Sequence, residues 1–310
     1  MIRINGLTEG LELFKTLGSE ARMQIIELLA KEGPMNLNEI AQALNLTNGA
    51  LTGHIRRLEE CGIIKVKAEH TGRGLQKICS LGENQILLNI HPQIEERSSK
   101  VYETELQIGH YSNYAVLSPC GLADSLQMLA QENDPRVFSY PQHLDAEILW
   151  FHDGYIEYRI PNLLPENQRI VQLTISLEMS SADQGAAAES GSLISFALND
   201  QPLCSWITEP EINSRGIYTP LWWKNHQCQH GHLKMLVINE MGIFIDGVKA
   251  QEPGTGWTFL DSHNEMRLRI ETHPFEGHDG GVAIYGSSFG NYKQNIQAIV
   301  HYVPEDLFAE

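Results

Sequence analysis

Ser19-Glu-Ala-Arg-Met-Gln-Ile-Ile-Glu-Leu-Leu29 opens a run of three short helices that the sequence predicts. Ser19 is a typical N-cap residue, and the apolar residues after it recur at the spacing of one helix face. The second helix is predicted over residues 38–44. The third is predicted over residues 48–61, with Thr47 as its N-cap. Three amphipathic helices so close in sequence predict a small unit with one shared core.

The third predicted helix has two faces of different chemistry. Leu51, Ile55 and Leu58 recur at steps of four and three, so they share a face that packs on the core. The other face offers amide, hydroxyl and guanidinium groups, which read base edges and phosphates in a major groove. We therefore expect DNA contacts from Thr47, Asn48, Gly49, Thr52, His54, Arg56 and Arg57.

A basic hairpin is predicted directly after this helix, over residues 63–79. Its strands carry Lys65, Lys67 and Lys77, and its tight tip holds Arg73 between two glycines. An arginine at such a tip is suited to a minor groove or a phosphate. Amphipathic helices and surface hairpins occur in many small domains, so the DNA-binding prediction depends on their order and spacing together.

Residues 11–80 resemble the ArsR-type winged-helix transcriptional regulators. The resemblance implies homodimers that bind palindromic operators and usually release DNA when an effector binds. The metal-sensing branches carry cysteines in the helix before the recognition helix, and residues 38–44 contain none. The matching runs are Leu17-Gly-Ser-Glu-Ala-Arg-Met-Gln-Ile-Ile-Glu-Leu-Leu29, Leu37-Asn-Glu-Ile-Ala-Gln-Ala-Leu-Asn-Leu-Thr47 and Ala50-Leu-Thr-Gly-His-Ile-Arg-Arg-Leu-Glu-Glu-Cys-Gly-Ile-Ile64.

The charge of the chain is unevenly distributed. Residues 1–100 hold 12 Lys+Arg and 12 Asp+Glu, so the net charge of −17 lies entirely in residues 101–310. An acidic segment repels phosphate, and the DNA contacts are therefore expected in the N-terminal part.

The cysteines and the chain ends bear on the cellular compartment. Five scattered cysteines show no disulfide rhythm, which predicts a reduced protein of the cytoplasm. The first ten residues lack the apolar core of a signal peptide. No apolar run approaches the ~20 residues that a membrane span needs. We expect a cytoplasmic protein without membrane contact.

A chain of 310 residues is long enough for two domains. We predict a multidomain α+β chain with a winged helix-turn-helix DNA-binding domain over residues 1–82. A linker or dimerisation segment, with at most one short helix, is expected over residues 83–108. An all-β effector-binding domain is expected over residues 109–310.

The second half of the chain predicts strands. Apolar and polar residues alternate in about ten short segments, which is typical of a two-sheet sandwich or a jelly roll. Turn dipeptides at residues 153–154, 199–200 and 246–247 separate some of these segments. Only residues 122–131 predict a helix in this half.

The all-β domain is expected to bind a small molecule, because such folds bind sugars by stacking aromatic rings on them. All five tryptophans lie in this half. Trp150 follows apolar residues inside a predicted strand and is expected in the core. For the tryptophans at 222, 223 and 257, core packing and ligand contact both remain open. The candidate ligand residues are Trp206, Glu209, Arg215, Tyr218, Trp222, Trp223, Trp257, His273, His278 and Asp279.

A second, fainter resemblance covers residues 191–302, on the runs Ile194-Ser-Phe-Ala-Leu-Asn, Trp222-Trp, Ile245-Asp-Gly-Val and Phe289-Gly-Asn-Tyr. This stretch is similar to the jelly-roll effector half attached to some ArsR-type regulators of Gram-positive bacteria. The resemblance implies control of carbohydrate-utilisation genes and leaves the ligand itself unspecified.

A metal-responsive regulator is the alternative interpretation. Four metal donors recur at every second position, namely His226, Cys228, His230 and His232. On an extended strand they would share one face, and imidazole and thiolate suit Zn²⁺ or Cu. Alternate strand residues are ~6.6 Å apart, so one ion rarely reaches all four, and a polar loop is the plainer interpretation.

A carbohydrate-active enzyme is a further alternative, since glycoside hydrolases use two carboxylates across a cleft. Glu209 with Glu211, or Glu271 with Asp279, would supply such a pair, but acidic residues are abundant throughout this half. We therefore predict no catalytic residues and no cofactor. The features together predict a homodimeric winged-helix repressor that binds double-stranded operator DNA and a small-molecule effector, with a sugar as the first candidate.

Overall fold

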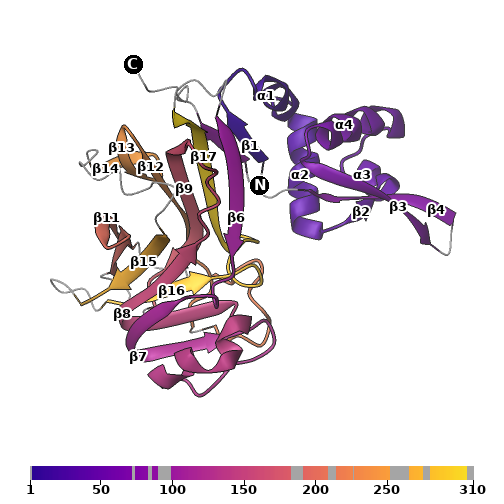
Figure 1. Ribbon diagram of the computed structural model, residues 1–310. Coiled ribbons are helices and arrows are strands. Elements are labelled where there is room, and N and C mark those ends of the chain that lie inside the picture. The colour runs from indigo at the N-terminus through magenta and orange to yellow at the C-terminus, as the bar shows by residue number, and fades with distance from the viewer. Residues whose placement is uncertain are drawn as a thin grey trace. The chain divides into compact units, whose positions relative to one another are not determined.

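The computed structural model describes residues 2–71, 74–82, 86–89, 99–182, 191–208, 214–225, 227–251, 265–274 and 280–305. The chain divides into two compact units, Met1–Arg97 and Ser98–Glu310. The α-helices of the described residues all lie in the first unit, and strands make up most of the second (Figure 1). No helix in the described ranges is long and apolar enough to cross a bilayer.

The first unit contains the three predicted helices and confirms a winged helix. A short helix that was not predicted precedes them, and the four are α1 (Leu11–Leu17), α2 (Glu20–Glu32), α3 (Leu37–Ala43) and α4 (Asn48–Glu60). Two small sheets complete the unit. One pairs β1 (Ile2–Asn5) in parallel with β5 (Ile86–Asn89), and the other has the order β2 (Met35–Asn36), β4 (Gly74–Leu81), β3 (Ile64–Thr71).

Capping side chains mark where α3 and α4 begin, whereas Ser19 lies at the N-cap position of α2 without a side-chain cap hydrogen bond. The Asn36 side chain accepts the backbone N–H groups of Asn38 and Glu39 at 2.9 and 3.0 Å. Glu39 in turn accepts the Asn36 N–H at 2.8 Å, which completes a capping box at the start of α3. Thr47 accepts the Ala50 N–H at 3.3 Å and caps α4 as predicted. The helices then bury Ile25, Leu29, Ile40, Leu51 and Leu58 in one core.

The second unit is built from strands and two short 3₁₀ helices. Its strands are β6 (Lys100–Leu106), β7 (Asn113–Ala123), β8 (Ile148–Ile160), β9 (Gln168–Ser180), β10 (Leu193–Leu198), β11 (Gln201–Ile207), β12 (His232–Asn239), β13 (Gly242–Ile245), β14 (Val248–Gln251), β15 (Met266–Thr272), β16 (Val282–Tyr285) and β17 (Ile296–Pro304). The 3₁₀ helices are η1 (Pro135–Ser139) and η2 (Pro141–Asp145). β5 and β6 lie within the segment expected as a linker over residues 83–108. Residues 95–98 of the charged run that could form a short helix lie outside the described residues.

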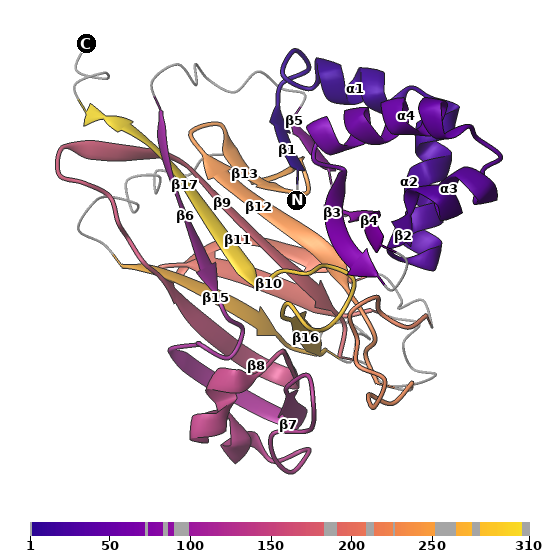
Figure 2. The same cartoon turned by 90° about the vertical axis from the view of Figure 1, so that its right-hand side faces the viewer.

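The strands of the second unit join in one antiparallel sheet. Its main path runs β11-β10-β15-β8-β16-β9-β12-β13-β14, with β7 on β8, and β17 between β9 and β6. The 13-residue strands β8 and β9 change partners along their length, and β16 pairs with both. The sheet therefore curls over its main apolar core like a nearly closed barrel (Figure 2). A second, smaller cluster contains Trp150, Trp223 and Phe289. The all-β prediction is confirmed, but hydrogen bonds connect what was predicted as two separate sheets.

Local backbone conformation explains which predicted turns form. Asn199, Asp200 and Asp246 have φ values of 50°, 64° and 51°, and Gly247 has φ 81°. Positive φ at both central residues suits two-residue hairpins, and these turns are confirmed between β10 and β11 and between β13 and β14. Residues 153–154 are not a turn, because they lie inside β8, where Asp153 pairs with β7 and Gly154 pairs with both β7 and β15.

The helix predicted over residues 122–131 is wrong. Leu122 lies in β7 and is buried, while Leu126 is 79% exposed, so the apolar spacing that predicted a helix face does not face one side. The Asp124 carboxylate accepts the N–H groups of Leu126 and Gln127 at 2.6 and 2.7 Å. Such local bonds compete with a helix and hold this segment in a turn.

Candidate nucleic-acid interface

Helix α4 has an apolar face and a polar face, as the sequence predicted. Leu51, Ile55 and Leu58 are buried in the core of the first unit. The predicted contact residues of the opposite face are all exposed, except His54, which is half-buried. The exposed set is Thr47, Asn48, Gly49, Thr52, Arg56 and Arg57.

The polar side chains of this face have few and weak partners within the protein. Arg56 Nε donates to Glu60 Oε1 at 2.8 Å, and the two side chains are 79% and 57% exposed. An exposed pair one helical turn apart contributes only about 0.3–0.5 kcal/mol, so a phosphate can replace Glu60 at little cost. Asn48 Nδ2 donates to Asn38 Oδ1 at a long 3.4 Å. These amide and guanidinium groups are therefore available to DNA.

The two glycines of α4 leave room for a close approach. A Cβ atom built on Gly49 or on Gly53 would have no heavy atom within 4 Å. Each glycine weakens a helix interior by about 1 kcal/mol relative to alanine. Because these two positions have no side chain, DNA can come close to the helix backbone on this face.

The β3–β4 hairpin carries its lysines on two faces. Lys65 and Lys67 alternate with Val66 along β3, and both are exposed. Lys77 on β4 lies opposite Ala68, so it points to the other face of the ribbon, the one that Val66 occupies. The sequence alone grouped the three lysines together, and the register separates Lys77 from the other two. Arg73 lies outside the described residues.

The first turn of α2 contains a buried arginine whose role was not predicted. Arg22 is 7% exposed. Its Nε donates to the Thr16 carbonyl at 2.5 Å and its Nη2 to the Lys15 carbonyl at 2.9 Å. These are carbonyls of the last turn of α1, so Arg22 joins α1 to α2 and has a structural role.

The predicted ligand residues of the second unit differ in burial and in the residues that they contact. Trp223 is buried, packs edge-to-face on Trp150 and Phe289, and donates from Nε1 to the Cys228 carbonyl at 2.9 Å. It therefore belongs to a core cluster, as does Trp150. Trp222 is 37% exposed and donates to the Ser125 carbonyl at 2.9 Å.

Of the remaining candidates, Arg215 contacts one of those tryptophans, since its Nη2 donates to the Trp223 carbonyl at 3.5 Å. The Trp206 ring lies beneath the Lys234 ammonium, 3.9 Å from its centroid, and His273 Nδ1 is 2.5 Å from Asp153 Oδ1. Arg215 donates to the Pro220 carbonyl in its own loop, where Tyr218 is half-buried. Glu209, Trp257, His278 and Asp279 lie outside the described residues, as does Glu211 of the proposed carboxylate pairs.

The histidine- and cysteine-rich segment is not the extended strand that the metal interpretation required. β12 begins only at His232. Cys228 is buried and its Sγ donates to the Ser181 carbonyl at 3.4 Å, whereas His230 Nε2 is 3.0 Å from Ser214 Oγ. His226 lies outside the described residues. Within the described ranges, no three His, Cys, Asp or Glu side chains are grouped to hold a metal ion.

The segment between β16 and β17 contains a motif that was not predicted. Gly286-Ser-Ser-Phe-Gly290 has the Gly-x-Ser-x-Gly spacing of a serine nucleophile. In hydrolases this motif forms a strand-to-helix turn. Here it follows β16 and leads through an irregular segment into β17, and the Ser288 N–H donates to Glu147 Oε2 at 3.0 Å. The strand–turn–strand context does not form a nucleophile elbow.

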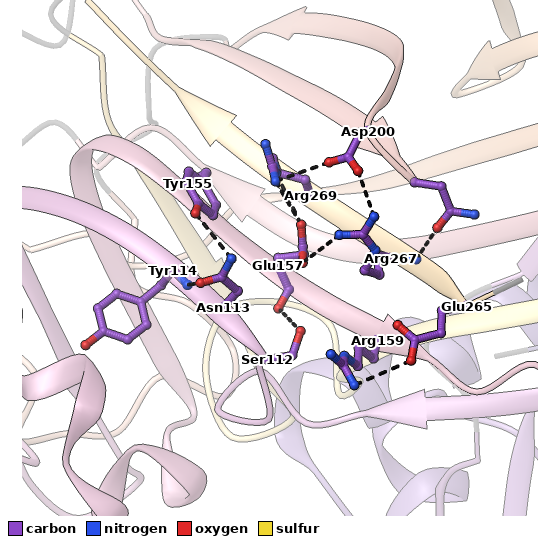
Figure 3. Close-up of polar contacts among 11 residues, drawn as sticks. Ser112, Asn113, Tyr114, Tyr155, Glu157, Arg159, Asp200, Glu265, Arg267 and Arg269 are labelled. Atoms are coloured by element: carbon purple, nitrogen blue, oxygen red, sulfur yellow. Dashed lines mark hydrogen bonds and ion pairs between the residues drawn. The ribbon is translucent and has the colours of Figure 1, made fainter.

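A polar hollow in the second unit was also not predicted. It has a volume of about 570 Å³ and is lined by Ser112, Asn113, Glu157, Arg159, Asn199, Glu265 and Arg267 (Figure 3). The sequence does contain a pattern that indicates a charged sheet face, since charged residues alternate with apolar ones along residues 155–160 and 266–271. That pattern was used only to predict strands.

Comparisons with known proteins agree with the geometry of the first unit. The family described as winged helix-turn-helix DNA-binding matches residues 19–65. An uncharacterized HTH-type transcriptional regulator of Methanocaldococcus jannaschii is 33% identical over 60 residues, which cover 19% of this chain and 67% of that protein. An uncharacterized protein of the same organism is 38% identical over 53 residues, or 17% of this chain and 58% of its own length.

Solved structures include similar domains. One is a homodimeric winged helix-turn-helix DNA-binding domain from Mycobacterium bovis, described as a possible ArsR-family transcriptional regulator. It is 22% identical, covers 25% of this chain and 67% of its own, and has a TM-score of 0.22.

Proposed function

Because this chain belongs to the HTH-type transcriptional regulators and carries a winged helix-turn-helix DNA-binding domain, we propose that it is a ligand-controlled repressor. In this proposal the first unit binds a specific operator as part of a homodimer. The second unit, a jelly-roll-like sensor in a cytoplasmic protein, binds a small-molecule effector. The effector most consistent with its chemistry is a sugar, and its binding lowers operator affinity.

The two-faced helix α4 is the observation that carries the proposal. Its apolar face is buried, so the side chains of its polar face have a fixed direction. Asn48 and Arg56 can then form the bidentate contacts with adenine and guanine that read sequence in a major groove. Lys65 and Lys67 on the adjacent hairpin supply sequence-independent contacts with phosphates.

The division of charge supports a separate sensing role for the second unit. Residues 101–310 hold the whole net charge of −17, which opposes phosphate binding there. This unit nevertheless has a large apolar core of its own and a polar hollow on its surface. An effector that weakens operator binding 100-fold needs about 2.7 kcal/mol of differential binding between the two states.

Selection of duplexes from a random library, followed by fluorescence anisotropy, tests the proposal. The wild type is expected to enrich one palindromic site. Asn48→Ala or Arg56→Ala is expected to cost about 1–3 kcal/mol on that site and much less on random duplex, because each reads a particular base pair. Gln42→Ala, an exposed change on α3, serves as the matched control.

Equal losses on the selected site and on random duplex would show that α4 does not read bases. Failure of the wild type to enrich any site would contradict the proposed function as a whole.

A further inference from the structure

The outward face of β8 and β15 carries a charged array in the second unit. Ile156, Tyr158 and Ile160 of β8 point into the core, so the residues between them point to the opposite side. β15 has the same alternation, with Arg267 and Arg269 outward. The hollow of about 570 Å³ lies on this outward face (Figure 3).

Strand register arranges the array in rows across the sheet. Glu157 on β8 lies opposite Asn113 on β7 and opposite Arg269 on β15. Arg269 in turn lies opposite Ala197 on β10, whose small side chain leaves space beside the guanidinium. Four strands that are distant in sequence therefore contribute to one surface.

Ion pairs hold the side chains of the array in place. The Glu157 side chain is only 6% exposed, and its Oε2 accepts from Arg269 Nη2 at 3.1 Å. Arg267 lies 3.8 Å from Glu157 Oε1 and donates to Asp200 Oδ2 at 2.7 Å. Because each carboxylate touches both guanidinium groups, the donors and acceptors are ordered before any ligand arrives.

The charge of the hollow distinguishes between classes of ligand. Arg159 pairs with Glu265 at 3.5 Å on the exposed rim, so the lining of the hollow holds two arginines, Arg159 and Arg267, and as many carboxylates. An anionic ligand would meet the carboxylates of Glu157 and Glu265, which oppose its charge. An apolar ligand would leave the same groups desolvated and unpaired. A neutral ligand rich in hydroxyl groups avoids both penalties.

Hydroxyl groups also match the hydrogen-bonding capacity of the array. Each hydroxyl both donates and accepts, while carboxylates accept and guanidinium and amide groups donate. Planar bidentate groups span neighbouring hydroxyls, as the Arg and Glu forks here can. Tyr155 adds an aromatic ring beside them, 4.4 Å from the Arg269 guanidinium, and accepts from Asn113 Nδ2 at 3.3 Å. The volume lies within the range of small-molecule sites.

We propose that this hollow is the carbohydrate site of the sensor unit, with Asn113, Glu157 and Arg267 as its central contacts. Arg269 holds the Glu157 carboxylate in place from beside the hollow. The inference rests on the proposed function, because it supplies the ligand site that a sugar-responsive repressor needs. It also moves that site away from the tryptophans that the sequence suggested.

Titration calorimetry on the full-length protein tests the site. The probes are neutral sugars (glucose, galactose, mannose, xylose, arabinose and their disaccharides), with inorganic phosphate and citrate as anionic probes. The wild type is expected to bind at least one neutral sugar, and Arg267→Ala to weaken that binding at least about tenfold, as the loss of one charge-assisted contact predicts. Glu157→Gln, which keeps the side-chain volume, is expected to do the same.

Arg136→Ala is the matched control, since it also removes an exposed guanidinium paired with an aspartate in the same unit. It is expected to leave sugar binding unchanged. Equal binding by wild type and Arg267→Ala would place the sugar elsewhere, and binding of phosphate or citrate alone would overturn the ligand class. No binding by any sugar would overturn the inference.

Operator binding measured on the same proteins shows whether a failed test contradicts the sugar site or the proposed repressor function. Arg267→Ala without sugar is expected to bind the selected duplex like the wild type. An unchanged tryptophan fluorescence spectrum shows that its second unit is folded, because all five tryptophans lie in residues 101–310. If operator binding is intact and sugar binding is absent, this inference fails and the DNA-binding function stands. If the wild type does not bind any selected duplex, the proposed function fails.

Discussion

Glu178 is a carboxylate with no exposed surface near the C-terminal end of β9. Its oxygens accept the backbone N–H groups of Gly231, Asn291 and Tyr292 at distances of 2.8 to 3.0 Å. Gly290 passes so close that a Cβ atom there would lie 2.3 Å from Glu178 Oε1. One side chain thus fixes two irregular segments, before β12 and before β17, to the sheet.

The same carboxylate should make the second unit sensitive to pH. Burial raises the pKa of Glu178 from 4.5 to about 7, although its three N–H partners oppose the shift. The folded state therefore holds the proton more tightly than the unfolded state. Its contribution to stability is complete below pH 4.5 and is lost as the pH rises to about 7, by about 3 kcal/mol in total.

Urea unfolding followed by tryptophan fluorescence measures this effect, because all five tryptophans lie in residues 101–310. The unfolding free energy of the wild type, relative to that of Glu178→Gln, is expected to fall as the pH rises from 4.5 to about 7 and to level off above that. Glu240→Gln, at an exposed position, is the control. A difference that is the same at every pH would contradict the prediction.

At the scale of elements, the lysines of β3 test the wing. Lys65→Ala and Lys67→Ala should each weaken binding on operator and on random duplex alike. Each should also reduce the slope of log affinity against log salt by about 1, because one phosphate contact is lost. Anisotropy over a salt series measures this, with the exposed Lys293→Ala of the second unit as control. An unchanged slope would show that β3 does not contact DNA.

Gly154 lies in the middle of β8 at a place where the sheet curves. Its φ is +115°, and a Cβ atom there would lie 1.9 Å from the Ala115 carbonyl oxygen on β7. Gly154→Ala is expected to destabilise the second unit by more than about 2 kcal/mol, because backbone atoms must move apart. Gly247→Ala is the matched comparison, since Gly247 has φ +81° and no heavy atom within 4 Å of its added Cβ.

Gly247→Ala should cost only about 1 kcal/mol, the strain of the positive φ alone. Urea unfolding followed by tryptophan fluorescence compares the two variants. Similar losses in both would show that the contact with β7 does not restrict residue 154.

Element prediction succeeded where local residues decide the structure. Apolar spacing predicts α2, and caps together with apolar spacing predict α3 and α4. The hairpin turns at 199–200 and 246–247 follow from residues that tolerate positive φ. It failed at residues 153–154 and 122–131. In the first case a turn-like pair continues a long strand, because β7 and β15 bind it on both sides. In the second, Asp124 bonds locally and ends the strand.

At the scale of the whole molecule, the proposed dimer makes a prediction about stoichiometry. Sedimentation of the protein with its selected duplex is expected to give two chains per palindromic site, since a two-fold protein matches a two-fold operator. A duplex that carries one half-site is the control and should bind with much lower affinity. One chain bound to the full palindrome at saturation would contradict the homodimer.

The sequence by itself determined which part of this protein is the DNA-binding domain and where its net charge lies. The three helices, the basic hairpin, the two-faced α4 and the location of the net charge of −17 depend on residues that are close in the chain. Local spacing, capping and charge suffice to predict such features, and the match over residues 19–65 agrees with them. The tertiary structure decided what depends on register between distant strands. Glu157, Arg269 and Asn113 come together only because β8 pairs with β15 and β7, and the same pairing turns the predicted sandwich into one curled sheet.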